Sequence, residues 1–127
     1  MTEISWQDRI FFGVAALSGA LSVAGDAAGK HLLAADAYRL DLAATATRYG
    51  LIHALALLGL IVLARMVGTS RWPRIASWLF VAGLILFCGS LGLIATGAPH
   101  GLAIFAPWGG TAFILGWIAL LPMAVRR

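Results

Sequence analysis

The chain has 127 residues, of which 61% are hydrophobic and 11% are charged, and its formal charge is +4 at pH 7. A soluble domain carries about 25% charged residues, so this composition excludes an ordinary water-soluble globule and predicts one domain, residues 1–127, embedded in lipid. The basic residues stand at the ends of apolar runs without interleaved aromatic residues, which argues against nucleic acid as a partner. The single cysteine, Cys88, excludes an intrachain disulfide framework.

The first apolar run covers residues 9–26 and predicts the first transmembrane helix. A secretory signal peptide is the competing interpretation, but the preceding arm lacks the positive charge that a signal peptide requires. Within the run, Ser18, Ser22 and Asp26 recur every four residues and form a polar stripe on one helix face. A second stripe consists of alanines that allow another helix to approach closely: Ala16, Ala20, Ala24 and Ala28.

Residues 27–44 form a mixed polar and apolar connection, for which two interpretations stay open. Residues 33–46 either form a helix that lies on the membrane surface or belong to an ordinary connecting loop. The second predicted span, residues 45–64, is about 30 Å long at 1.5 Å per residue, which matches the hydrocarbon thickness. Beyond its entry, the strongly polar side chains are Tyr49 and His53, which are four residues apart and share one helix face.

The third and fourth predicted spans are residues 75–96 and 108–125, and Pro107 suits the first turn of the fourth. Basic residues favour the cytoplasmic side of a membrane protein. Six of them would share one side: Arg9, Arg65, Arg71, Arg74, Arg126 and Arg127. The other side would hold three: Lys30, Arg39 and Arg48. The sequence therefore predicts an all-α polytopic membrane protein, an antiparallel four-transmembrane-helix bundle with cytoplasmic N- and C-termini.

A polar layer is expected near the bilayer midplane, because Ser18, His53 and Cys88 each lie about 12 Å inward from the expected outer ends of their helices. One interpretation is a small pocket, open toward the outer face, that holds a proton, a metal ion or the head of an apolar cofactor such as a quinone. Its candidate residues are Asp26, His31, Tyr49, His53 and Cys88. The other interpretation is that His53 bonds a serine hydroxyl or a backbone carbonyl and holds helices together. No ligand pair has the local spacing of a metal motif, so neither a metal nor another cofactor is predicted.

Small residues in the apolar runs predict close helix packing. The candidate packing residues are Gly19, Gly89, Ser90, Gly109, Gly110 and Gly116. One packing face of the fourth span is formed by Gly109, Phe113, Gly116, Trp117 and Leu120. The Gly109–Gly110 pair is not read as a phosphate-binding loop, because no lysine and no preceding strand accompany it.

Four groups of residues carry a resemblance to a known family. They are Gly29-x-His31-x-Leu33, Tyr49-x-x-x-His53-Ala54-Leu55-Ala56, Gly89-Ser90-Leu91, and Pro107-x-Gly109-Gly110-x-x-Phe113-x-x-Gly116-Trp117. In this order and spacing, they resemble the small bacterial family catalogued as domain of unknown function 423, which has similar four-span relatives in mitochondria. The resemblance covers residues 13–120, and it implies an integral membrane protein without an established activity.

Two functional hypotheses follow, and neither is enzymatic, because no nucleophile–base motif such as GxSxG occurs. The leading hypothesis is a structural or accessory subunit of the bacterial inner membrane, which packs against a larger membrane complex. Its partners would be the lipid bilayer and other membrane protein subunits. The alternative is a module that binds or conducts a small ligand, such as a metal ion, a proton, a quinone or a lipid, through the polar layer around His53.

Overall fold

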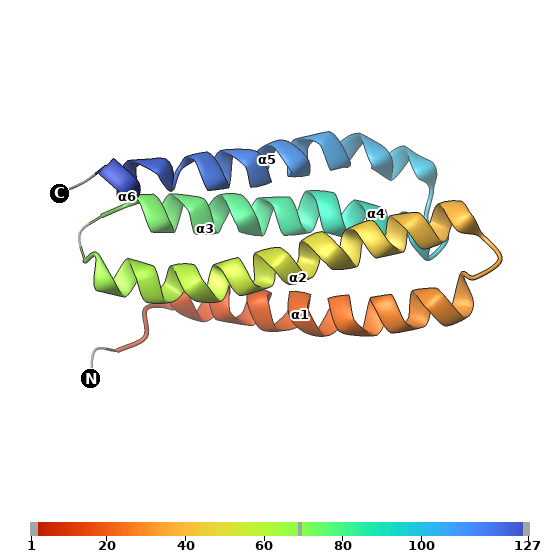
Figure 1. Ribbon diagram of the computed structural model, residues 1–127, viewed down its shortest axis with the longest axis horizontal. Helices are drawn as coiled ribbons and strands as arrows, with labels where there is room; N and C mark the ends of the chain where they lie inside the picture. The colour runs from red at the N-terminus through yellow and green to blue at the C-terminus, as the bar shows by residue number, and fades with distance from the viewer. Residues whose placement is uncertain (1–2, 69, 126–127) are drawn as a thin grey trace.

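The computed structural model describes residues 3–68 and 70–125, and this part of the chain is helical apart from short connections. Four stretches of helix, each long and apolar enough to cross a membrane, run alternately in opposite directions (Figure 1). They cover Trp6–Leu32, Ala37–Met66, Trp72–Ala95 and His100–Val125. The expected all-α, four-span fold is confirmed. The first and last described residues lie at the same end of the molecule, which we call the termini end (Figure 1).

The first two spans form a helical hairpin. Helix α1, Trp6–Leu32, begins after Ser5, whose hydroxyl accepts the Asp8 N–H at 3.1 Å. Helix α2, Ala37–Met66, begins after Asp36, whose carboxylate accepts the Arg39 N–H at 3.0 Å. We call the end where these helices join the hairpin end.

The hairpin corrects the expected boundaries of the connection. Residues 37–46 form the first turns of α2, so this stretch is neither a separate surface helix nor a loop. The Asp36 cap sets the start of α2, and Leu40 and Ala43 pack against Gly29 of α1. With 27 and 30 residues, α1 and α2 are about 40 and 45 Å long. Both exceed the hydrocarbon thickness of about 30 Å, so their polar ends project from it.

The third span is continuous but not uniform. It consists of α3, Trp72–Gly83, a π-helical turn η1, Leu84–Cys88, and α4, Gly89–Ala95. A π turn leaves carbonyl groups with poor backbone partners. The Ser90 hydroxyl donates to the carbonyls of Leu86 at 2.6 Å and Phe87 at 3.1 Å. The Ser90 hydroxyl therefore bonds its own span, and the residue itself is 5% exposed on a helix that packs against α2. The span ends at Gly97, whose φ of +105° favours glycine.

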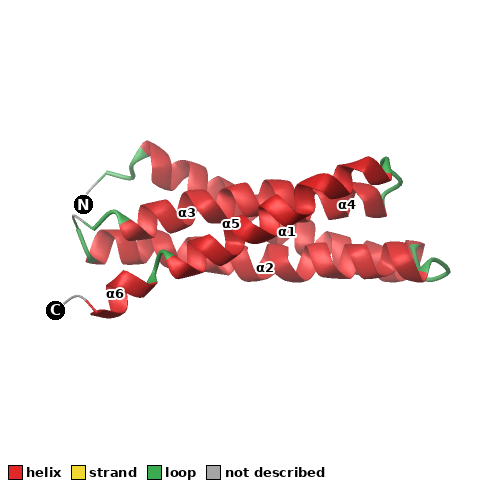
Figure 2. Cartoon of the chain, turned by 90° about the horizontal axis from the view of Figure 1, so that it is seen from above, coloured by secondary structure: helices red, strands yellow, loops and turns green. Residues whose placement is uncertain are grey.

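The fourth span begins earlier than expected. A 3₁₀ helix η2, His100–Phe105, leads into α5, Ala106–Ile118, and a short helix α6, Leu121–Val125, follows. The sequence predicts the start of this span at residue 108. Pro107 lies within the first turn of α5, where its missing N–H costs no hydrogen bond. Pro122 cannot continue α5, and the chain turns before α6 (Figure 2).

The spans pack in sequence order across the molecule. Figure 1 shows α1 and α5 on opposite sides, with α2 and α3 between them. Helix α1 packs chiefly on α2 and reaches α3 near the termini end, where the Phe11 and Trp78 rings meet edge to face at 4.9 Å. Helix α5 packs on α3 and η1. The apolar core therefore lies mainly between α2, α3, η1 and α5, and α1 is a flank.

Glycines allow the closest approaches in this core. A Cβ at Gly109 would collide with the backbone of Phe87, and one at Gly116 would collide with the Phe80 ring. Gly110 and Gly89 are in ordinary contact, because their added Cβ atoms would lie 3.7 Å from Phe87 and 3.8 Å from the Leu84 carbonyl oxygen. A Cβ at Gly19 would meet nothing within 4 Å, so Gly19 marks no close approach inside this chain. Gly83, which the sequence did not single out, receives the Phe113 ring.

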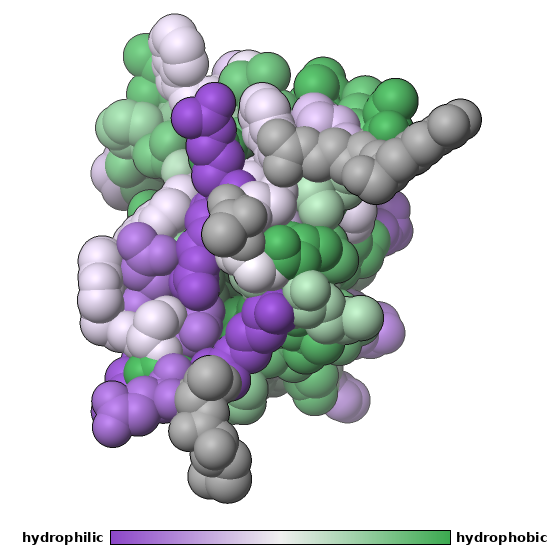
Figure 3. Space-filling model, turned by 90° about the vertical axis from the view of Figure 1, so that its left-hand side faces the viewer, coloured by the Kyte–Doolittle hydropathy of each residue, from purple (hydrophilic) through white to green (hydrophobic). Residues whose placement is uncertain are grey.

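A buried carboxylate joins the first three spans at the termini end. Asp8 is only 3% exposed, and it accepts hydrogen bonds from Arg74 Nη1 at 2.8 Å and from Arg65 Nη2 at 3.3 Å. Both arginines are partly exposed. Figure 3 views this end and shows hydrophilic side chains gathered across it. We call this three-residue cluster the Asp8 clamp. The cytoplasmic placement of the termini end stays a prediction.

Asp8→Asn removes the charge that two guanidinium groups share. We expect the free energy of unfolding to fall by about 1–3 kcal/mol, less than for a fully buried pair because the arginines reach water. Thermal unfolding in detergent measures the loss. Glu3→Gln, which removes an exposed charge from the same arm, is the control. An Asp8→Asn protein as stable as Glu3→Gln would contradict the clamp.

Gly109→Ala places a methyl group against the Phe87 backbone and forces α5 away from η1. We expect it to lower the free energy of unfolding by about 1–3 kcal/mol in the same assay. The matched control is Gly92→Ala in α4, where an added Cβ meets nothing within 4 Å. Alanine is the better helix former, so Gly92→Ala is expected to be neutral or stabilising. Equal effects at both positions would rule out this close approach.

Candidate functional site

The buried histidine of α2 has a defined protonation pattern. His53 is 2% exposed, and its ring nitrogens both have partners. Nδ1 lies 2.8 Å from the Tyr49 carbonyl oxygen, and Nε2 lies 3.2 Å from Nε1 of Trp117. An indole N–H can only donate, so Nε2 must accept and Nδ1 must carry the proton that it donates to Tyr49. The geometry therefore selects one neutral tautomer, and only the Trp117 bond joins two spans.

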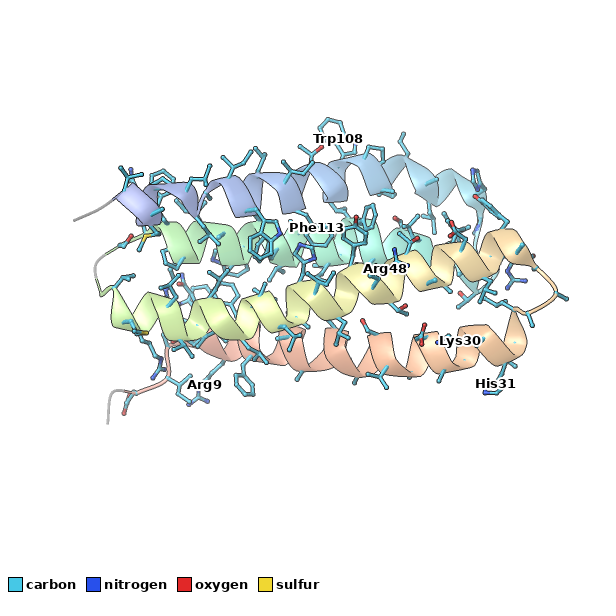
Figure 4. The ribbon with its side chains drawn as sticks, viewed as in Figure 1. Arg9, Lys30, His31, Arg48, Trp108 and Phe113 are labelled. Atoms are coloured by element: carbon cyan, nitrogen blue, oxygen red, sulfur yellow. The ribbon has the colours of Figure 1, made fainter. Side chains whose placement is uncertain are left out.

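Aromatic rings fill the space around this histidine. The Phe113 ring stacks on His53 with centroids 3.6 Å apart, and the Phe80 ring meets it edge to face at 4.9 Å. The Tyr49 ring stands edge-on to Phe87 at 5.2 Å. Figure 4 shows Phe113 inside the bundle, whereas Trp108 of the same helix points away from it. We call six residues the aromatic layer: Tyr49, His53, Phe80, Phe87, Phe113 and Trp117.

The five candidate pocket residues do not converge on one site. Tyr49 and His53 lie together, as their spacing predicts. Asp26 instead pairs with Lys30 at 2.7 Å on the exposed surface of α1. His31 is exposed at the hairpin end (Figure 4). Cys88 lies half-buried in η1 beside the apolar core.

The expected polar layer also resolves into separate contacts. The Ser18 hydroxyl donates to the Gly50 carbonyl at 3.0 Å rather than to His53. Within residues 3–68 and 70–125, no three His, Cys, Asp or Glu side chains come close enough to hold a metal ion. Over the same residues, every fully buried side-chain nitrogen or oxygen has a hydrogen-bond partner. The surroundings of His53 thus support its role in packing, and they leave neither ring nitrogen free to bind a ligand.

Sequence reasoning missed the partner of His53. Trp117 was assigned only to a packing face with Gly109, Phe113 and Gly116, and nothing in its spacing pointed to α2. The available signal was the i, i+4 relation of Phe113 and Trp117, which places both rings on one side of α5. A buried histidine near the midplane needs a donor or acceptor from another span, and the Trp117 indole was the strongest donor on that face.

Comparisons with known proteins agree with the fold. A family model described as "Protein of unknown function (DUF423)" matches residues 25–110. The UPF0382 membrane protein YwdK of Bacillus subtilis is 33% identical over 121 residues, which cover 93% of this chain and 98% of YwdK. The UPF0382 inner membrane protein YgdD of Escherichia coli K12 is 36% identical over 120 residues, which cover 93% of this chain and 91% of YgdD. No solved structure matches the chain.

Trp117→Phe removes the indole donor and leaves His53 Nε2 without its partner. We expect the free energy of unfolding to fall by about 1–2 kcal/mol. Trp108→Phe makes the same change at a position of α5 that is 69% exposed and is expected to change stability little. Nitrogen-15 NMR of labelled histidine checks the tautomer directly. A proton found on Nε2 instead of Nδ1, or equal losses in both variants, would refute this assignment.

Proposed function

This chain belongs to the DUF423 family of bacterial membrane proteins, and we propose that it is a structural accessory subunit that packs against a larger membrane complex. The chain is a multi-pass protein of the bacterial inner membrane. What supports the proposal is that its interior is used for packing: the aromatic layer is filled, and His53 has both ring nitrogens bonded within the chain. Any contact with another molecule then falls to the outer faces of the helices.

Helix α1 offers the most available of these faces. Its buried face, which includes Phe11, Ser22 and Gly29, lies against α2. The opposite face is exposed and carries a row of small residues over three turns, Gly13, Ala16, Ala20 and Ala24, with exposed Leu17 beside them. We call it the small face. A Cβ at Gly13 would meet nothing within 4 Å. In lipid, helices associate through van der Waals contact, and small residues let their backbones approach closely.

Charge favours a different protein over a second copy as the occupant of the small face. Arg9 is exposed at the termini end of this face and points away from the bundle (Figure 4). A two-fold dimer with its axis along the membrane normal would bring Arg9 next to Arg9 of the other copy, and like charges repel. A partner helix that carries a carboxylate at this level would instead form an ion pair.

Gly13→Leu tests the proposal, because it raises a side chain on the small face without touching the fold. We expect the variant to lose a partner that purifies with the wild-type protein from native membranes at fixed stoichiometry, as measured by native mass analysis. Gly59→Leu is the matched control, because Gly59 is also an exposed helical glycine with nothing within 4 Å of its added Cβ.

Site-specific photocrosslinking gives an independent readout of the same surface. A photoreactive residue at Ala20 is expected to capture the same partner, and one at Gly59 is not. Recovery of the wild-type protein only as a free monomer or self-oligomer would overturn the proposal. The alternative, a ligand module around His53, would require one ring nitrogen to be released from Tyr49 or Trp117, and no observation favours it.

A further inference from the structure

A groove runs between α1 and α2 in the half of the hairpin nearest its loop. It comprises two adjoining hollows of about 440 and 240 Å³, which share Asp26 and Ala44. We call it the α1–α2 groove. Its smaller hollow is lined by small residues that include Gly25, Gly29 and Ala44. Its larger hollow is lined by apolar Val23 and Leu51 and by four polar residues: Ser22, Asp26, Thr47 and Arg48.

In the described part of the chain, Arg48 lacks the protein partners that bind Arg39, Arg65 and Arg74. Arg39 donates to the Ala95 carbonyl at 2.8 Å, and Arg65 and Arg74 both bind Asp8. Among the described residues, no carboxylate lies within ion-pair distance of Arg48. Asp26 is held by Lys30 at 2.7 Å. One acid and two bases therefore leave the groove with a net charge of +1.

Ser22 is the second unusual group in this groove. Its residue is 6% exposed and lines the larger hollow. Its hydroxyl makes no hydrogen bond with any described residue, whereas the hydroxyls of Ser18 and Thr47 donate to the carbonyls of Gly50 and Ala44. Every fully buried side-chain oxygen of the described residues has a partner, so the unbonded Ser22 hydroxyl keeps some exposure, and a molecule in the hollow that Ser22 lines can offer it an acceptor.

The charged residues place this groove at a definite depth. Asp8 and Asp26 lie about 27 Å apart along α1, and Arg65 and Arg48 lie about 26 Å apart along α2, at 1.5 Å per residue. These spacings are close to the hydrocarbon thickness of about 30 Å. Asp26 and Arg48 therefore lie at the boundary between headgroups and acyl chains, where lipid phosphates are found. Ser22 lies about 6 Å deeper than Asp26 along the helix.

We propose that the α1–α2 groove binds one anionic glycerophospholipid. The Arg48 guanidinium binds the phosphate through charge-assisted hydrogen bonds. The Ser22 hydroxyl, one helical turn deeper, donates to a glycerol ester carbonyl, and an acyl chain lies along Val23 and Leu51. The net charge of the groove matches a headgroup of charge −1. A zwitterionic headgroup fits less well, because its ammonium group would compete with Lys30 for Asp26.

This site is independent of the accessory-subunit proposal, since it lies beside α2 whereas the small face is on the other side of α1, and it needs no protein partner. It also differs from the sequence-based pocket around His53. Of those five candidates, only Asp26 lines the groove. The two proposals can therefore fail separately.

Native mass spectrometry of the full-length protein in detergent tests the site. Phosphatidylglycerol is titrated in, with phosphatidylcholine of the same acyl chains as the comparison. We expect one phosphatidylglycerol to bind in preference to phosphatidylcholine. Arg48→Gln should raise the apparent Kd for phosphatidylglycerol about tenfold, because it removes a charge-assisted hydrogen bond. Ser22→Ala should raise this Kd about threefold without changing the preference between the two lipids.

Arg9→Gln is the matched control, because it removes an exposed arginine from the opposite end of α1 and should leave phosphatidylglycerol binding unchanged. Thermal unfolding of each variant without added lipid verifies that the fold is retained. Glycerol phosphate, added as a competitor, separates a lipid site from a site for free phosphate. Equal losses in Arg48→Gln and Arg9→Gln, equal binding of the two lipids, or full displacement by glycerol phosphate would each overturn the proposal.

Discussion

Lipid hydrocarbon offers no hydrogen bonds, so each polar group in the middle of this protein must find its partner within the chain. Most hydroxyls find an acceptor within their own helix. The hydroxyls of Ser77 and Thr111 donate to carbonyls one turn earlier in their own helices, those of Pro73 and Pro107. His53 cannot do so with both nitrogens, and its second bond reaches Trp117 on another span. This requirement gives α2 and α5 a fixed rotation toward each other.

The aromatic layer packs the core around this hydrogen bond. Large rings need space between helices, and glycines on the facing helix provide it. Phe113 fits over Gly83, and Phe80 fits over Gly116, so α3 and α5 each contribute a ring and a glycine to the same contact. The exchange is reciprocal, and it brings the two helices close along their length without a polar contact. Helix α1 has no part in it and packs chiefly on α2 instead.

The four spans could be predicted from composition, because no other arrangement covers so much apolar surface. Their ends could not, since charged residues such as Asp36 and Arg39 look like a loop when a helix projects beyond the hydrocarbon. The i, i+4 rule correctly paired Tyr49 with His53. Counting residues for depth placed Cys88 level with His53 but could not predict the direction of its side chain. The π turn at 84–88 adds a residue to the helical repeat there, and no sequence pattern predicted it.

The distance between the Asp8 clamp and the Asp26–Arg48 level has a consequence for the surrounding bilayer. At about 26–27 Å, it is a few ångströms shorter than an average hydrocarbon layer. Lipids next to the protein must compress or tilt to meet both charged levels, at a fraction of a kcal/mol per ångström of mismatch. That elastic strain is smallest where membranes are thin, and it draws together proteins that share the same short hydrophobic height.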